Sequence, residues 1–199
     1  MKTSYLTLII SILFLSCGSS SINPKIEGFK MPLPENWYDN SDLDLKDNLA
    51  KYDLEEEEIS KLLKNNKGSV PVVIYTKYDP ATFNGPIPTI QVLLRSTNTS
   101  HINEFKETMT KSLNQMSNML PDFKILSPLE IIKIDGFEAV KFVSQFNMPL
   151  NENETSTIRS WTYAIPSGKH FYQINFSDME NENCENLYAD LIRQLKLKK

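Results

Sequence analysis

Apolar and polar residues alternate through the stretch from Asp122 to Ser177, and this alternation constrains the fold more than any other feature of the sequence. A period of two residues is the pattern of a β-strand with one buried face. It divides the stretch into four predicted strands, at Phe123–Ile134, Phe137–Met148, Thr157–Ile165 and His170–Phe176. Asp135-Gly136 and Ser167-Gly168 each separate two of these strands, and such dipeptides favour tight turns because glycine readily adopts positive φ. The stretch therefore predicts an antiparallel meander.

The last three predicted strands each have a clearly apolar side. The residues on these sides are Val140, Phe142, Phe146 and Met148 in the second strand, Trp161, Tyr163 and Ile165 in the third, and Tyr172, Ile174 and Phe176 in the fourth. Polar residues such as Lys141, Gln145 and Gln173 take the alternating positions. We expect the sheet to have one strongly apolar face, which has to be covered by a layer of helices.

The clearest helix is predicted between Ser100, a capping residue, and Pro121, which cannot continue a helix. Apolar residues three or four positions apart form a single stripe along it. The stripe consists of Ile102, Phe105, Met109, Leu113, Met116 and Leu120. A stripe at this spacing is typical of a helix that packs on a core.

Two capping boxes predict two further helices. Asp53 with Glu56 opens a helix that extends to Lys64, and Ser177 with Glu180 opens a final helix near the end of the chain. The residues expected to face inward from the final helix are Cys184, Leu187, Tyr188, Leu191 and Leu195. The basic residues Lys196, Lys198 and Lys199 would suit its C-terminal end, where the helix dipole favours positive charge.

Three more strands are predicted upstream of the long helix, at Lys25–Leu33, Val70–Tyr78 and Pro88–Ser96. A turn that contains Trp37 follows the first, and the loop Asp79–Ile87 joins the other two. This loop presents Phe83 and Pro86, and a long loop with an aromatic side chain is a candidate surface for contact with a protein partner. A plain hairpin loop with Phe83 tucked underneath explains the same residues.

The first 16 residues have the layout of a secretory signal peptide. Lys2 supplies a positive charge, and Tyr5–Leu15 forms an apolar segment too short to span a membrane. The residues from Phe14 to Cys17 resemble the lipobox of bacterial lipoproteins, although Phe14 departs from the usual leucine. The resemblance implies cleavage between Ser16 and Cys17 and acylation of Cys17, which makes membrane lipid the expected first partner. A plain signal peptide with a chance cysteine is the alternative.

Residues 17–24 are then expected to be a lipidated tether, and residues 25–199 a single α+β domain, since this length suits one domain better than two. The formal net charge of −4 argues against a nucleic-acid-binding surface, which needs a clustered basic stripe. With Cys17 acylated, Cys184 has no disulfide partner, because the chain contains two cysteines. Its place on an apolar helix side is that of a small buried residue rather than a reactive thiol.

The order of the predicted elements resembles the Mog1/PsbP-like fold, in which helices enclose an antiparallel sheet in an α/β/α sandwich. The residues that carry the resemblance are Phe29–Trp37, Ile134–Phe137 and the segment Tyr163–Phe176 before the last helix. The resemblance covers about residues 25–197. It implies a non-catalytic accessory or binding protein, often lipid-anchored in bacteria, although a fold alone does not determine a function.

No motif for catalysis or for metal binding stands out. The two histidines, His101 and His170, have no neighbours at the spacing of metal ligands. The sequence also lacks the Gly-rich phosphate loop, the nucleophile elbow and the zinc-binding His-Glu-x-x-His pattern. We therefore expect no enzymatic activity and no cofactor.

These features favour a lipid-anchored, non-catalytic envelope lipoprotein that binds an envelope protein partner or supports assembly of a complex. No acidic run follows Cys17, which favours a domain that faces the periplasm. The alternative is a small-ligand carrier or sensor with a cleft at the sheet edge, lined by Trp161, Tyr163 and Tyr172. An enclosed pocket with converging polar groups would favour the ligand, and a flat apolar patch would favour the protein partner. A hydrolase would need titratable groups within hydrogen-bond reach.

Overall fold

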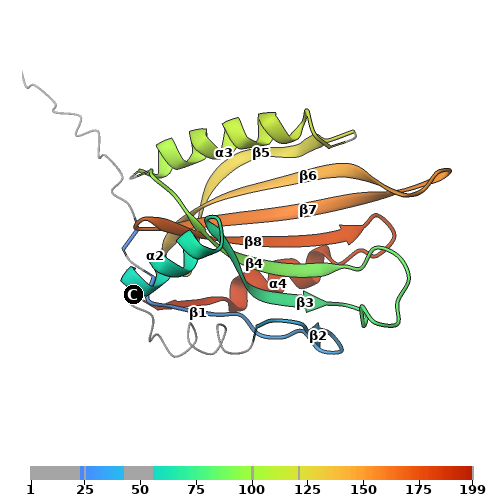
Figure 1. Ribbon diagram of the computed structural model, residues 1–199, viewed down its shortest axis with the longest axis horizontal. Coiled ribbons are helices and arrows are strands. Elements are labelled where there is room, and N and C mark those ends of the chain that lie inside the picture. Colours follow the sequence, from blue (N-terminus) through green and yellow to red (C-terminus); the bar gives the residue numbers. More distant parts are fainter. Residues whose placement is uncertain (1–22, 25, 43–55, 100, 121, 199) are drawn as a thin grey trace, which may run out of the picture.

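The computed structural model describes residues 23, 24, 26–42, 56–99, 101–120 and 122–198 (Figure 1). The predicted signal peptide and the lipobox residues Ser16 and Cys17 lie outside the described residues, as do the predicted capping residues Asp53 and Ser100. Within the described ranges, none of the helices has the length and apolar character needed to cross a membrane.

Seven strands form the main sheet, in the order β2-β3-β4-β8-β7-β6-β5, and all neighbours are antiparallel. Their bounds are β2 Tyr38–Asp39, β3 Ser69–Thr76, β4 Thr89–Ser96, β5 Lys124–Ile134, β6 Phe137–Asn151, β7 Glu154–Ser167 and β8 His170–Met179. Strands β5 to β8 are the predicted meander, and β8 returns beside β4, so the upstream hairpin extends the same sheet. The prediction of an α+β fold around a central antiparallel sheet is confirmed.

The turn between β5 and β6 forms as predicted. Asp135 and Gly136 have φ angles of 46° and 84°, which lie in the left-handed region that a type I′ turn requires. Asp135 also makes a tertiary contact, because its Oδ2 accepts a hydrogen bond of 2.8 Å from the backbone N–H of Leu197. The turn between β7 and β8 falls one residue later than predicted, at Gly168 and Lys169.

The apolar sides of β6 and β7 lie on opposite faces of the sheet, so the expectation of one strongly apolar face is wrong. Val140 pairs with Ala164 and Phe142 with Thr162, and residues directly opposite each other share a face. Trp161 is the neighbour of Thr162 in β7, and successive residues of a strand point to opposite faces, so Trp161 faces away from Phe142. We call the face with Trp161, Tyr163, Ile165, Tyr172, Ile174 and Phe176 the core face, and the face with Val140, Phe142, Ala164 and Phe171 the groove face.

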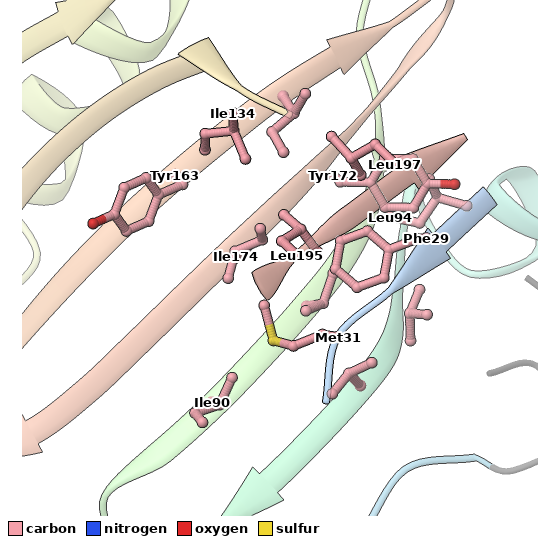
Figure 2. Close-up of a cluster of buried hydrophobic side chains, with 14 of the residues drawn as sticks. Phe29, Met31, Ile90, Leu94, Ile134, Tyr163, Tyr172, Ile174, Leu195 and Leu197 are labelled. Atoms are coloured by element: carbon pink, nitrogen blue, oxygen red, sulfur yellow. The ribbon is translucent and has the colours of Figure 1, made fainter. Parts of the chain in front are cut away.

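The core face carries the larger hydrophobic cluster, part of which is shown in Figure 2. Helix α4 (Glu185–Gln194) contributes Tyr188, whose ring centroid lies 4.7 Å from that of Phe176. Helix α2 (Glu56–Asn65) contributes Ile59 and Leu63 to the same cluster. The groove face is covered in part by α3 (Ile102–Met116), through a separate smaller cluster, so helices pack on both faces of the sheet.

A two-stranded sheet joins the two ends of the described chain. Strand β1 (Gly28–Lys30) pairs antiparallel with β9 (Lys196–Lys198), and the ring of Phe29 stacks on Tyr172 at 5.2 Å. The predicted first strand, Lys25–Leu33, is thus shorter than expected and stands outside the main sheet. The predicted basic end of the final helix is also wrong, because Lys196 and Lys198 belong to β9, while Lys199 lies outside the described residues.

The start of the described chain is tied to the ends of β6 and β7. Asn23 donates through Nδ2 to the carbonyl oxygens of Glu138 and Pro166, at 2.6 and 3.0 Å. Its Oδ1 accepts a hydrogen bond of 2.7 Å from the backbone N–H of Glu138. The backbone N–H of Ile26 donates to Ser167 Oγ at 2.7 Å. The segment is therefore fixed at one end of the sheet.

The final helix begins later than its predicted capping box. Ser177 lies inside β8, where it pairs with Ser160 of β7 and with Thr89 of β4. The backbone hydrogen bonds that β8 forms with both neighbouring strands outweigh the single hydrogen bond that the Ser177 side chain could make as a helix cap. The helix instead begins at Glu185, after the buried Cys184. The expectation that Cys184 is a small buried residue is confirmed.

Candidate ligand-binding groove

A groove of about 1090 Å³ lies between α3 and the groove face of the sheet. Its floor comes from β6, β7 and β8, with further residues from the end of β4, and its wall comes from α3. The wall residues are Phe105, Thr108, Met109, Ser112, Leu113, Gln115 and Met116. Sites for small molecules usually span about 300–1,000 Å³, so the groove is large enough for an elongated ligand.

The groove exists because α3 covers mainly the half of the groove face that β5 and β6 form. Phe105 packs edge-to-face on Phe171, with centroids 5.0 Å apart, and both belong to the smaller cluster. Apart from this contact with β8, α3 lies along β5 and β6, whereas β8 and β4 are farther across the sheet (Figure 1). The far end of the helix is less buried, since Met116 is 41 % exposed and Met119 just beyond is 79 % exposed. The floor thus remains open beside the helix.

The floor is organised in rows that cross β6, β7 and β8, because residues in register share a face. From one end to the other, the rows are Phe146–Ile158–Met179, Ser144–Ser160–Ser177, Phe142–Thr162–Asn175 and Val140–Ala164–Gln173, followed by Phe171 with Arg95 of β4. Adjacent rows are two residues, or about 7 Å, apart. The floor therefore changes from apolar, through hydroxyl and amide groups, to a guanidinium.

A chain of hydrogen bonds fixes the amide groups of the floor. Arg95 Nη1 donates to Gln173 Oε1 at 2.8 Å, and Gln173 Nε2 donates to Asn175 Oδ1 at 3.0 Å. Thr162 Oγ1 donates to the same oxygen at 3.1 Å. Among the residues that the structure describes, Asn175 Nδ2 has no acceptor. This amide is a free donor that faces the groove.

The hydroxyl row adds further unused polar groups to the floor. Within the described part of the chain, the hydroxyls of Ser144, Ser160 and Ser177 make no hydrogen bond. A hydroxyl can donate one hydrogen bond and accept two, so the row offers both functions to water or to a ligand. These residues converge on the middle of the groove.

The wall, in contrast, is apolar in effect. The hydroxyls of Thr108 and Ser112 are turned back to the helix, where they donate to the carbonyl oxygens of Glu104 and Thr108 at 2.9 and 3.1 Å. The side chains that remain are mainly those of Met109, Leu113 and Met116. The charged residues of α3, which are Glu104, Lys106, Glu107 and Lys111, do not line the groove. Flexible methionines adapt well to apolar ligands of different shape.

The aromatic residues predicted to line a ligand cleft lie elsewhere. Trp161, Tyr163 and Tyr172 are on the core face and are only 6 %, 6 % and 1 % exposed. Figure 2 shows Tyr172 beside Phe29 and Leu197 in the hydrophobic cluster. Burial raises the pKa of the Tyr172 phenol above its ordinary value, as expected for a hydroxyl without access to water. The structure therefore makes these residues core residues and places the groove on the other face.

The predicted contact loop borders both the groove and a second hollow. Pro86 lines the groove, whereas Phe83 is 37 % exposed and stacks on Tyr78 at 4.4 Å. The hollow, of about 590 Å³, is also lined by Trp37 and Tyr38. Its open shape offers aromatic surface but little enclosure. Contact of this loop with a partner stays a prediction.

The titratable groups near the last helix are engaged in structural contacts. Asp178 has a fully buried side chain whose Oδ1 pairs with Arg159 Nη2 at 3.3 Å, while Oδ2 accepts a hydrogen bond of 2.9 Å from the Cys184 N–H. Burial raises the pKa of this carboxyl, and the two partners oppose the shift. Within the described ranges, no group of three His, Cys, Asp or Glu side chains is placed to hold a metal ion.

The fold and the groove together define an α+β sandwich domain with an open, amphipathic groove. No protein-family model matches the sequence, and no curated protein matches it either.

Several solved structures are similar to the chain. LpqN, involved in cell envelope biogenesis of Mycobacterium tuberculosis, is 16 % identical with a TM-score of 0.49, over 86 % of this chain and 83 % of LpqN. The PsbP protein (CyanoP) of Synechocystis sp. PCC 6803 is 11 % identical with a TM-score of 0.49, over 92 % of this chain and 96 % of its own. A putative regulator of unknown function from Pseudomonas aeruginosa is 16 % identical with a TM-score of 0.44, over 59 % of this chain and 79 % of that protein. At these values none of these proteins lends this chain an activity or a partner.

Proposed function

We propose that this chain is a lipid-anchored, non-catalytic protein of the cell envelope that holds an elongated, largely apolar small molecule in the groove under α3. The observation that carries the proposal is the combination of an apolar wall with free polar groups that converge on the floor. Ligand sites typically combine an apolar lining with a few placed polar groups, whereas protein-docking patches are flatter and more uniformly apolar. This is the carrier hypothesis, with the groove in place of the aromatic cleft.

The proposed lipid anchor and the proposed location in the cell envelope are supported by the sequence. The lipobox-like segment up to Cys17 supports acylation of that cysteine, and the absence of an acidic run after it supports a periplasmic orientation. Several buried acyl chains, at about 0.8 kcal/mol for each methylene, hold a protein on a bilayer stably. Mass spectrometry of the mature protein tests this step, because acylation adds mass to the N-terminal peptide and Cys17→Ala abolishes it.

A non-catalytic role is supported by the chemistry of the groove lining. This lining, in the ranges that the structure describes, contains no histidine and one carboxylate, that of Asp178, which is fully buried on the other face with Arg159. Hydrolysis needs a nucleophile with a base in hydrogen-bond reach, and none of the described lining residues offers such a base to the free serine hydroxyls. The serines therefore serve better as hydrogen-bonding groups than as nucleophiles.

Binding of a fluorescent apolar probe, N-phenyl-1-naphthylamine, to the secreted chain with Cys17→Ala tests the proposal. Both hydrophobic clusters lie between Ile26 and Leu197, so this protein keeps its complete core. Ser160→Trp fills the centre of the floor, and we expect it to weaken probe binding at least about tenfold. Lys111→Trp, on the exposed side of α3, is the matched control and should bind like the parent.

Circular dichroism establishes that each variant is folded. Met116→Asp gives an independent test, because this side chain is 41 % exposed at the groove wall and tolerates a charge. Probe binding that is equal in the parent, Ser160→Trp and Met116→Asp would rule out the groove as the binding site.

A second candidate is contact with an envelope protein through the Asp79–Ile87 loop. It is favoured by the exposure of Phe83 (37 %) and Tyr38 (49 %), which line the same hollow. Crosslinking in the native envelope, read by mass spectrometry, should then show one dominant partner that Phe83→Asp loses. A partner retained by that variant would exclude the loop.

A further inference from the structure

Charge is unevenly distributed along the groove. Among the described residues, the lining contains two cationic side chains, Lys67 and Arg95, and a single carboxylate, Asp178. The Asp178 carboxylate is buried against Arg159 on the core face, so it does not offset them. In a chain with a formal net charge of −4, the part of the groove that the structure describes thus presents a net positive charge. Such a surface favours an anionic ligand group and disfavours a cationic one.

Arg95 is placed to receive an anion. Its Nη1 donates to Gln173 Oε1, and its guanidinium lies over the ring of Phe171 at 5.8 Å, so both neighbours restrict its orientation. Among the described residues, no carboxylate lies within 4.0 Å of it. The planar guanidinium has five N–H donors, and most of them remain available for a carboxylate or a phosphate.

Arg95 and the fully apolar row mark opposite ends of the floor. Phe171, which pairs with Arg95, and Met179, in the apolar row, are eight residues apart on β8. At about 3.4 Å per residue in an antiparallel strand, this separation is about 27 Å. Between the two ends lie the amide and hydroxyl rows on the floor and the apolar wall of α3. The groove therefore suits a long molecule with one charged end.

We propose that the ligand is a single-chain anionic amphiphile, whose head group binds Arg95 and Lys67; this inference rests on the proposed function. Its acyl chain runs under α3 toward the row of Phe146, Ile158 and Met179. The shared chemistry is an acyl chain with a carboxylate or a phosphate head, as in a fatty acid or a lysophospholipid. Arg95 is the residue that determines the preference for an anionic head group.

A chain-matched series of ligands tests the head group in the secreted Cys17→Ala protein. Dodecanoate, dodecyl phosphate, dodecanol and dodecyltrimethylammonium compete with N-phenyl-1-naphthylamine below their micelle concentrations. We expect the better of the two anions to bind roughly two- to fivefold tighter than dodecanol, the range of an exposed ion pair, and the cation to bind weakest. Which of the two anions binds more tightly also shows whether the natural head group is a carboxylate or a phosphate. Salt should reduce the preference, because the guanidinium is exposed.

Variants separate the head-group site from the groove itself. Arg95→Gln should remove the preference for the anion and leave dodecanol binding unchanged, and Lys111→Gln, a cation of α3 outside the groove, should change neither. An anion preference that survives Arg95→Gln, or equal binding of all head groups, would overturn this inference while the proposed function stands. Failure of every ligand to bind would overturn both.

A photoreactive tail tests the orientation. Octadecanoate with a diazirine at its methyl end has a chain long enough to approach the far row from Arg95, and it should crosslink to peptides that contain Met116, Phe146 or Met179, at the apolar end of the groove. Crosslinks confined to the peptide around Arg95 would reverse the orientation and refute the assignment of the head group.

Discussion

Replacing Phe105 with alanine tests whether α3 is a separable wall of the domain. The Phe105 side chain is 2 % exposed and packs on Phe171 in the smaller cluster, apart from the main core. Removing a buried phenyl group costs about 3–5 kcal/mol. We expect the lower end, about 3 kcal/mol, because water in the adjoining groove can fill part of the space. Since 1.4 kcal/mol is a factor of ten, the fraction of molecules with α3 detached should rise about a hundredfold.

Hydrogen exchange read by mass spectrometry measures this change locally. The amides of α3 should exchange faster in Phe105→Ala, while those of β7 and β8 keep their protection. Phe176→Ala is the matched control, because this side chain is 0 % exposed in the larger cluster and its loss should speed exchange across the whole domain. Equal acceleration in α3 and in the sheet of Phe105→Ala would refute the reasoning, since α3 would then unfold only with the rest.

Three further predictions concern the stability of the domain. Burial raises the folded-state pKa of Asp178, so the stability that this group contributes is present below about pH 4 and is lost as the pH rises through the folded-state pKa. The unfolding free energy of Asp178→Asn, measured with urea, should therefore improve relative to the parent as the pH rises, and a constant difference would contradict the assignment. Gly136→Ala should lower the unfolding free energy by about 1–2 kcal/mol because of its left-handed φ of 84°, and an unchanged urea midpoint would exclude this. The Cys184 thiol, whose pKa is raised by burial, should resist thiol reagents until the protein unfolds, so rapid labelling of the native protein would count against its burial.

Local patterns in the sequence predicted the meander well. The turn at Asp135 and Gly136 and the alternation in β6, β7 and β8 depend on neighbouring residues and on glycine φ, so they can be read from the sequence. The stripe of α3 was also predicted, although the helix ends at Met116 rather than before Pro121. These elements are determined by short-range chemistry.

Long-range pairing explains most of what the sequence did not predict. The local capping signal at Ser177 is overridden by the strands on either side of β8, and the C-terminal lysines pair with β1 instead of ending a helix. Both features depend on which distant segments meet. Sequence periodicity contains no information on that choice.

The site was missed for a related reason. Alternation shows that Trp161 and Phe142 each lie on an apolar side of a strand, but only the register between β6 and β7 shows that these sides are opposite. The row of Ser144, Ser160 and Ser177 is likewise formed by three strands in register. The signal available in the sequence was weak: of these serines, Ser144 is at an inward position of a predicted strand, whereas Ser160 is on a polar side and Ser177 follows the last predicted strand. It acquires meaning only when the rows are aligned.

The hydrogen bonds of Asn23 have a consequence for the geometry at the membrane. Asn23 is fixed to Pro166, and Pro166 lies in register with Phe171 and, through it, with Arg95, so the chain enters the domain at the cationic end of the groove. From Cys17 to Asn23 the chain can span at most about 20 Å, even when fully extended. The proposed acylation of Cys17 would therefore keep the cationic end of the groove within about 20 Å of the lipid head groups. An anionic lipid that leaves the bilayer with its head group first would then meet Arg95 close to the membrane surface. A lipid that leaves with its acyl chain first would have to reverse its direction before its head group could reach Arg95.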